Sequence, residues 1–274
     1  MSSDGHLPLG QAIALGVLHG PAELLPISSS GHVALIPWLA GWEWDAADPE
    51  LRKAFEVAVH AGTAAALLIT LRTEVSDAMQ ELNVRRLELI ALSFLPPAAV
   101  GYRLERLIEQ RLGTPATIAA GLICGAIVMA LADRTPQSRT ATDAGAVDAI
   151  CLGLAQACAL VPGVSRNGAT LAAARMRRFT REDANRLSRH VALPVIAGAT
   201  VLKGARLMAR GLPPRGAAPI VAGAAASFAS TLGSTWLIRQ VERDRSLLPY
   251  ALYRLALATV VLRRVVRHRT TSCT

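Results

Sequence analysis

The sequence predicts an all-α integral membrane protein, an inverted-repeat bundle of about six transmembrane helices plus two re-entrant helical hairpins. Hydrophobic residues make up 52% of the 274 positions. Two uncharged runs, residues 112–132 and 216–238, are long enough to cross about 30 Å of hydrocarbon. Two polar, hydroxyl-rich breaks interrupt apolar sequence, and such breaks usually line a site. The alternative is an alanine-rich soluble bundle, which leaves the two long runs unexplained.

The N-terminal part predicts the first hairpin. Residues 1–51 contain no Lys or Arg, so the positive-inside rule places this end outside the cytoplasm. Apolar pieces at residues 9–25 and 32–42 flank a serine triplet, and each is short for a full crossing. We therefore expect a hairpin that enters and leaves the membrane on one face.

The rest of the first half predicts alternating helices and charged loops. We expect a spanning helix over residues 54–71, on which Glu56 and His60 share one face and point inward. Residues 72–88 and 103–111 are predicted as charged loops. Between them, residues 89–102 form a short helix interrupted by two prolines, and residues 112–132 cross the membrane.

A linker at residues 133–143 divides one membrane domain, 1–274, into pseudo-repeat halves 1–135 and 145–274. Ser28 to Gly31 match Ser165 to Gly168 at an offset of about 137 residues. An inverted second half places residues 175–189, with six arginines, in the cytoplasm. The same count puts the basic tail outside, against the charge rule, so the side of the tail stays open.

The first polar break lies in the string GVLHGPAELLPISSSGH at residues 16–32. His19 and Glu23 are four residues apart, so they lie on one helix face. Ser28, Ser29 and His32 follow, and a histidine beside hydroxyls is a common pair of base and nucleophile. The simpler interpretation is that the serines only cap a helix.

The second polar break is PGVSRNGAT at residues 162–170. An arginine in apolar sequence is costly and usually marks function. Arg166 stands between Ser165 and Asn167 at the start of a predicted helix, where a guanidinium, hydroxyls and backbone N–H groups form an anion pocket. Phosphate is the expected occupant. The alternative, Arg166 reaching toward the membrane interface, leaves the surrounding string unexplained.

Four strings carry a resemblance to a known family: ELLPISSSGH, FEVAVHAGT, PGVSRNGAT and ALYR. They resemble the undecaprenyl-diphosphatase family of the bacitracin-resistance type, over nearly the whole chain. The resemblance implies a multi-pass phosphatase of the bacterial plasma membrane with its active site toward the outer face. It would hydrolyse undecaprenyl diphosphate to the monophosphate and inorganic phosphate, recycling the lipid carrier of peptidoglycan synthesis and conferring bacitracin resistance. It also implies a divalent cation, Mg²⁺ or Ca²⁺.

The resemblance also implies roles for individual residues. The catalytic residues are Glu23, Ser29, His32 and Arg166, and the substrate-binding residues are Ser28, Ser165, Asn167 and Thr170. His19 and Glu23 are the metal candidates. Three positions depart from the family pattern, since His19 replaces an acid or glutamine, His60 a frequent glutamine, and Asn167 a serine. A His and Glu pair suits a borderline metal better than Mg²⁺ or Ca²⁺.

Several alternatives remain at this point. A transporter or flippase of a polyprenyl phosphate carrier would need the Arg166 pocket but no nucleophile. The substitution at His19 also leaves room for a weakly active paralogue. The nucleophile is Ser29, His32 or water, and the oligomeric state stays open, with a homodimer among the options. Arginines clustered between apolar runs, without interleaved aromatics, argue against a nucleic-acid partner.

Overall fold

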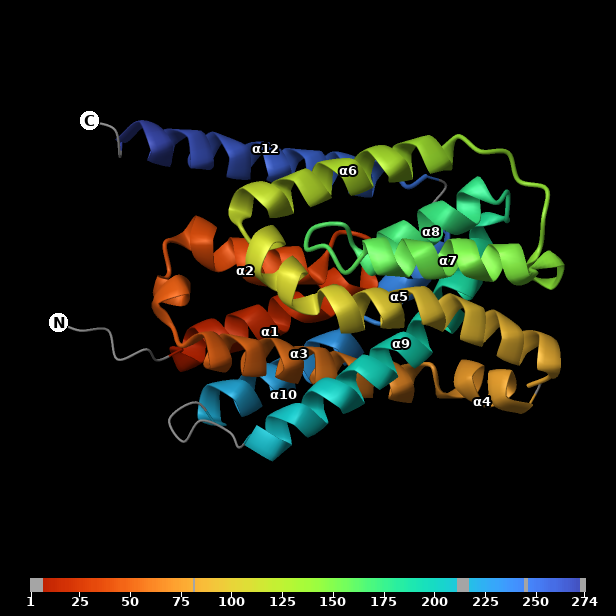
Figure 1. The fold of residues 1–274 in the computed structure, drawn as a ribbon, viewed down its shortest axis with the longest axis horizontal. Helices are drawn as coiled ribbons and strands as arrows, with labels where there is room; N and C mark the ends of the chain where they lie inside the picture. The colour runs from red at the N-terminus through yellow and green to blue at the C-terminus, as the bar shows by residue number, and fades with distance from the viewer. Residues whose placement is uncertain (1–6, 81, 211–216, 244–245, 272–274) are drawn as a thin grey trace. The chain divides into compact units, whose positions relative to one another are not determined.

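The computed structural model describes residues 7–80, 82–210, 217–243 and 246–271, and these are almost entirely helical (Figure 1). The only β-type pairing among them is one bridge between Arg139 and Phe179. The predicted all-α class is therefore confirmed. The chain separates into two compact units. Unit 1 comprises Met1–Leu24, His32–Leu82 and Ile196–Leu237, and unit 2 comprises Leu25–Gly31, Asn83–Val195 and Ile238–Thr274.

Each unit takes helices from both predicted halves, so the boundaries of the halves stay a prediction. The elements wholly in unit 1 are α1 (Leu9–Leu24), η1 (Glu43–Ala46), α3 (Pro49–Thr70), α4 (Arg72–Gln80) and α10 (Ala217–Gly233). Those wholly in unit 2 are α5 (Val84–Leu112), α6 (Pro115–Asp133), η2 (Ala141–Asp143), α7 (Ala146–Cys158), α8 (Arg166–Met176) and α12 (Leu248–Thr271). The units share α2 (Ser29–Ala40), α9 (Arg181–Arg210) and α11 (Trp236–Arg243).

Unit 1 is held together by the close packing of α1 and α3 on α10. A Cβ atom on Gly16 of α1 would collide with the carbonyl oxygen of Gly223, and one on Gly62 of α3 would collide with that of Ala224. Helices approach this closely only where small residues line the contact. Phe55 and other buried apolar side chains fill the adjoining core. The glycines thus fix α1, with His19 and Glu23, and α3, with His60, against one common helix.

Unit 2 contains a pair of helices, α6 and α12, that run side by side (Figure 1). The helix α8 packs on α6 and on α7, while α7 packs along α5. Met129, Leu171 and Leu247 belong to one buried apolar cluster that joins α6, α8 and the start of α12. This cluster supports the helix that begins at Arg166.

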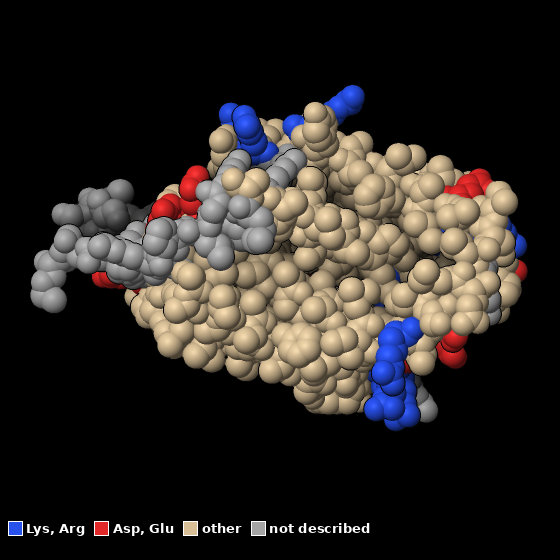
Figure 2. Space-filling model, turned by 90° about the horizontal axis from the view of Figure 1, so that it is seen from below, with Lys and Arg blue, Asp and Glu red and all other residues tan. Residues whose placement is uncertain are grey.

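Three described helices are long and apolar enough to cross a membrane: α3, the Val84–Leu104 part of α5, and α6. A fourth results if α10 and α11 count as one span, bent by 51° at the break between them. The run 216–238, predicted as one crossing, is therefore interrupted within its described part. Figure 2 shows a face with a broad area free of charged side chains. The protein is membrane-embedded, and the number of six crossings stays a prediction.

Two stretches predicted as charged loops are helical, so that prediction is wrong. Residues 72–88 contain α4 and the first turn of α5, and residues 103–111 belong to α5. Arginine, glutamate and leucine, which dominate both stretches, are good helix formers. Asn83 caps α5, because its side-chain oxygen accepts a hydrogen bond from the N–H of Arg86 at 3.0 Å.

The two prolines of α5 do not interrupt the helix as predicted. Pro97 has no N–H group, which leaves the carbonyl oxygen of Ser93 without its partner in the helix. The side-chain amide of Gln156 in α7 donates a hydrogen bond to that oxygen at 3.2 Å. A Cβ atom on Gly153, one turn earlier in α7, would lie only 2.9 Å from the same oxygen. A neighbouring helix thus repairs the backbone deficit of α5, as apolar surroundings require.

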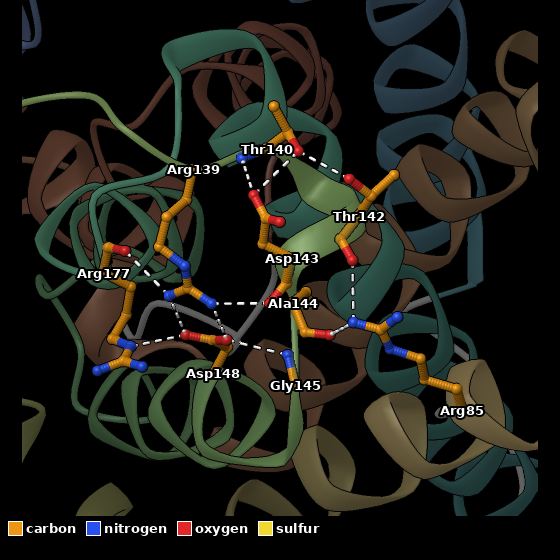
Figure 3. A network of polar contacts seen from close by, with 9 residues as sticks. All are labelled: Arg85, Arg139, Thr140, Thr142, Asp143, Ala144, Gly145, Asp148 and Arg177. Carbon is orange, nitrogen blue, oxygen red and sulfur yellow. Dashed lines mark hydrogen bonds and ion pairs between the residues drawn. The ribbon is translucent and has the colours of Figure 1, made fainter.

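The segment predicted as a linker is fixed at its end by Asp148 of α7 (Figure 3). Both carboxylate oxygens of Asp148 accept from Arg139, at 2.7 and 2.9 Å, and one also accepts from Arg177 at 2.6 Å. The N–H of Gly145 donates to the carboxylate at 2.9 Å. Asp148 lies outside the candidate spans; burial alone would raise its pKa, but these hydrogen bonds lower it to about 2. The linker is therefore tied to α7 and α8.

Candidate active site

The two polar breaks share one backbone arrangement within unit 2. Ser28 has a φ of 78° and Ser165 a φ of 69°, a left-handed conformation that costs energy for residues other than glycine. The hydroxyl of Ser28 accepts from the N–H of Gly31 at 3.3 Å, and that of Ser165 accepts from the N–H of Gly168 at 3.2 Å. Each serine therefore caps the helix that follows it, α2 or α8. Strained backbone of this kind is frequent at functional sites.

A single buried arginine, Arg254 of α12, connects the two breaks. Its guanidinium donates to the carbonyl oxygen of Pro26 at 3.3 Å, and to those of Gly163 and Val164, both at 2.8 Å. A further bond reaches the carbonyl oxygen of Gly121 at 3.4 Å. The side chain is fully buried, and all these oxygens only accept. Arg254 therefore holds the loop before Ser28 and the loop before Ser165 in one place.

The two loops approach each other closely. A Cβ atom on Gly168 would lie 3.4 Å from the carbonyl oxygen of Pro26 and 2.9 Å from the guanidinium of Arg254. Leu25 packs against the buried cluster that includes Leu171 of α8. The beginnings of α2 and α8 thus lie in the same part of unit 2, together with the first backbone N–H groups and the positive dipole end of each helix.

Arg166 is the first residue of α8 and is partly exposed, whereas Ser28, Ser29 and Ser165 are buried. A partly exposed guanidinium beside capped helix starts can reach an anion that approaches the loops. Backbone N–H groups and a guanidinium are the donors that proteins use for phosphate. Arg166, predicted as catalytic, and Ser28 and Ser165, predicted to bind the substrate, therefore all lie in unit 2.

The hydroxyl of Thr170 has partners inside the protein. It donates to the carbonyl oxygen of Arg166 at 2.9 Å and lies 2.5 Å from the hydroxyl of Ser188, which donates to Asn167 Oδ1 at 3.4 Å. Thr170 is fully buried. Its direct contact with substrate stays a prediction, and the contacts observed give it a part in positioning the first turn of α8.

The remaining predicted site residues belong to unit 1. His19 and His32 are buried, and Glu23 is partly buried. His19 and Glu23 of α1 and His60 of α3 each have a ligating atom within 4.8 Å of those of the other two. The expectation that Glu56 also points inward is wrong, because its side chain is exposed. Two residues four positions apart, such as Glu56 and His60, share a helix face only approximately, since a helical turn has 3.6 residues.

Comparisons with known proteins decide the family. The family described as bacitracin resistance protein BacA matches residues 12–260. This chain belongs to that family. It is 41% identical to the undecaprenyl-diphosphatase of Geobacter sulfurreducens over 267 residues, covering 92% of this chain and 96% of the relative. Identity is 38% to the proteins of the same name from Geobacter metallireducens and Geotalea daltonii, covering 92% and 93% of this chain and 96% and 98% of the relatives.

Sequence reasoning missed Arg254 as a site residue of this member of the bacitracin resistance protein family. In the sequence analysis, Arg254 appeared only as the last residue of the ALYR string. The available signal was an arginine inside a largely apolar helix, which indicates a buried partner or a function. Its partners are backbone carbonyl oxygens far away in the chain, and no sequence pattern marks a carbonyl oxygen.

Proposed function

We propose that this chain is an undecaprenyl-diphosphatase that removes the terminal phosphate of the lipid carrier in the bacterial plasma membrane. The observation that carries the proposal is the meeting of two serine-capped helix starts with Arg166 in unit 2, held by Arg254. A diphosphate head group needs such a concentration of donors, while its isoprenoid tail stays in lipid. The names of the relatives supply the substrate.

In the proposed reaction, Arg166, the Ser165 hydroxyl and the N–H groups at the start of α8 hold the terminal phosphoryl group. They also stabilise the charge that gathers on its oxygens in the transition state. The Ser29 hydroxyl attacks the terminal phosphorus as the bond to the bridging oxygen breaks, and its proton passes to the departing undecaprenyl phosphate. Water then hydrolyses the phosphoserine and releases inorganic phosphate. Attack by His32 or directly by water are the alternatives, with Glu23 predicted to assist catalysis. No step here uses a metal ion.

The proposal includes a multi-pass protein with its site toward the outer face, a polyprenyl diphosphate as substrate and no nucleic-acid partner. The outer-face assignment follows from the lack of Lys and Arg in residues 1–51. Labelling of a cysteine introduced at Gly10 in intact cells tests it, because this glycine is exposed and has open space around it. Reaction with a membrane-impermeant thiol reagent only after lysis would place this end inside.

Arg166→Ala tests the function itself. Release of phosphate from undecaprenyl diphosphate by the purified protein in detergent should fall by roughly 10³-fold, because an arginine aimed at a transferring phosphoryl group contributes on that order. Arg166→Lys keeps the charge but loses the planar fork, so it should restore only part of the activity. Arg186→Ala is the matched control, since Arg186 is an exposed arginine of α9 in the same unit.

Phosphate release by Arg166→Ala at the rate of the parent protein would contradict the role of Arg166. Binding of the lipid diphosphate without any phosphate release by the parent protein would instead favour a flippase. For the nucleophile, acid quenching of the parent protein during turnover should trap a phosphoenzyme that Ser29→Ala lacks. A phosphoenzyme that persists in Ser29→Ala and disappears in His32→Ala would assign the attack to His32.

A further inference from the structure

Three side chains of unit 1 form a group outside the loops of unit 2. His19 and Glu23 come from α1 and His60 comes from α3, and their ligating atoms lie within 4.8 Å of one another. A tetrahedral ion with bonds of about 2.1 Å places its ligands about 3.4 Å apart, so small side-chain movements would let all three bind one ion. The rings of the two histidines are already close, with centroids 4.4 Å apart and an angle of 72° between their planes.

The hydrogen bonds around His19 determine which ring nitrogen carries the proton. The hydroxyl of Ser227 donates to the carbonyl oxygen of Val59 at 2.8 Å, and that of Thr231 donates to the carbonyl oxygen of Ser227 at 2.7 Å. The Thr63 hydroxyl lies 2.7 Å from the Ser227 hydroxyl, which has already used its own proton. Thr63 therefore donates to Ser227 and accepts, at 2.9 Å, from the Nδ1–H of His19.

Protonation at Nδ1 leaves a lone pair on Nε2 of His19. This atom is fully buried and has no hydrogen-bond partner among the described residues. A buried polar nitrogen without a partner is costly, and native proteins rarely leave one without a reason. A metal ion would use this lone pair, and the bond from Nδ1 to Thr63 is the usual second contact of a metal-binding histidine.

The Nδ1 atom of His60 is also engaged in a hydrogen bond. This nitrogen lies 2.7 Å from the backbone carbonyl oxygen of Glu56. Because that oxygen only accepts, Nδ1 carries the proton and Nε2 has the free lone pair. Both histidines thus have Nδ1 fixed by a neighbour and Nε2 in the form that binds metals.

The donor set decides which ion would bind. Mg²⁺ and Ca²⁺ take oxygen ligands, so two imidazoles and one carboxylate do not fit the cation that the family resemblance implies. Two histidines and a glutamate are a known ligand set of Zn²⁺, which leaves a fourth position open. We propose that His19, Glu23 and His60 form a binding site for Zn²⁺, positioned by Thr63 and the carbonyl of Glu56. The site lies entirely in unit 1, and its test does not depend on phosphatase activity.

The test is a metal titration of the full-length protein in detergent, purified without a polyhistidine tag and treated with a chelator. We expect one Zn²⁺ per chain after gel filtration, measured by mass spectrometry, and no loss of it in a large excess of MgCl₂ or CaCl₂. CoCl₂ should give the visible absorption of four-coordinate Co²⁺ with nitrogen and oxygen ligands. Displacement of Zn²⁺ by Mg²⁺, or no bound Zn²⁺, would overturn the proposal.

Single substitutions test which side chains bind the Zn²⁺ ion. His60→Gln should weaken Zn²⁺ binding by at least roughly 100-fold, and its partly exposed position makes it the variant that best keeps the fold. His19→Gln should do the same. Thr63→Val should weaken binding by about 10-fold, because it removes only the orienting hydrogen bond, and Thr63→Ser should restore it. His190→Gln, which removes an imidazole from unit 2, should bind as the parent does.

Equal Zn²⁺ affinity in His60→Gln and the parent protein would overturn the proposal. Zn²⁺ bound as expected by a protein that releases no phosphate would reject only the phosphatase function. Phosphate release by a protein that binds no Zn²⁺ would reject only the metal site.

Discussion

Two helices at related places of the predicted repeat, α1 and α7, pack alike but carry different polar side chains. Gly16 of α1 lies against the backbone of α10, and Gly153 of α7 lies against the backbone of α5. The buried polar residue one turn later is His19 in α1 and Gln156 in α7. Both helices lead to a break that begins with a left-handed serine. Both helices have the close helix contact and the break, but the residue at the buried polar position differs.

His19 and Gln156 make different interactions. The imidazole of α1 belongs to a proposed metal site, whereas the amide of α7 donates to a carbonyl oxygen that a proline has left unpaired. Leu160 and Ile196 stand where the first half has Glu23 and His60, so the second half lacks the ligands. Conversely, Arg166 of the second half aligns with Ser29 of the first. A duplicated helix contact can thus be kept while its polar positions diverge.

Replacing Arg254 should have the largest effect, because its guanidinium binds both the loop before Ser28 and the loop before Ser165. Arg254→Met leaves four buried carbonyl oxygens without their donor, which should cost about 3 to 5 kcal/mol of unfolding free energy. Thermal unfolding in detergent measures this loss, and phosphate release should fall with it. Arg263→Ala, at an exposed position of α12, is the control and should change stability by less than about 0.5 kcal/mol. An unchanged melting temperature for Arg254→Met would contradict the positioning role.

Alanine substitutions at the two packing glycines compare the helix contacts directly. Gly16→Ala and Gly153→Ala should each destabilise by about 1 to 3 kcal/mol, since a Cβ atom would press on neighbouring backbone. Gly16→Ala should cost more, because its Cβ would meet a helix backbone more closely. Gly10→Ala has open space around it and should stabilise α1 by up to about 1 kcal/mol. A stabilising Gly16→Ala, measured by the same thermal unfolding, would show that α1 and α10 are not in such close contact.

The last comparison concerns the start of α7, where Asp148 binds the linker, whereas Gln11 stands at the related place in α1. Asp148→Asn should cost about 2 kcal/mol, because it weakens charged hydrogen bonds from two arginines. The lowered pKa of Asp148 gives stability that is present above about pH 4 and lost as the pH falls toward 2.

Thermal unfolding of the parent protein and Asp148→Asn at pH 7 and near pH 2 measures this contribution, and the difference between them should shrink at the lower pH. Glu182→Gln, an exposed acid in the first turn of α9, is the control. A difference independent of pH would exclude the carboxylate as its source.

The sequence was sufficient for the fold class and for the location of the two breaks. Ser28 and Ser165 interrupt apolar runs, and such local patterns survive folding because caps involve neighbours in the chain. The prolines of α5 misled the prediction, because the amide that repairs the helix comes from Gln156, about sixty residues away. Local rules predict that a proline removes a backbone hydrogen bond from its helix, but they do not predict that a side chain of a neighbouring helix replaces this bond.

The site was predictable to a similar extent. His19 with Glu23, and Ser165 with Arg166, follow from spacing on one helix or loop. The closeness of His60 to His19 and the central place of Arg254 depend on helix packing, which glycines such as Gly16 and Gly62 determine through their missing side chains. Contacts between distant segments were therefore the part that sequence reasoning could not provide.

The left-handed backbone at Ser165 has a consequence for how the hydroxyl meets an anion. The Ser165 oxygen accepts from the N–H of Gly168, so one lone pair is engaged while its proton remains available for donation. An oxygen polarised in this way is a better donor to a phosphoryl oxygen and a poorer attacking group. In the proposed reaction, the capping Ser165 would therefore donate a hydrogen bond to the phosphoryl oxygen, and the bond to phosphorus would be formed by Ser29.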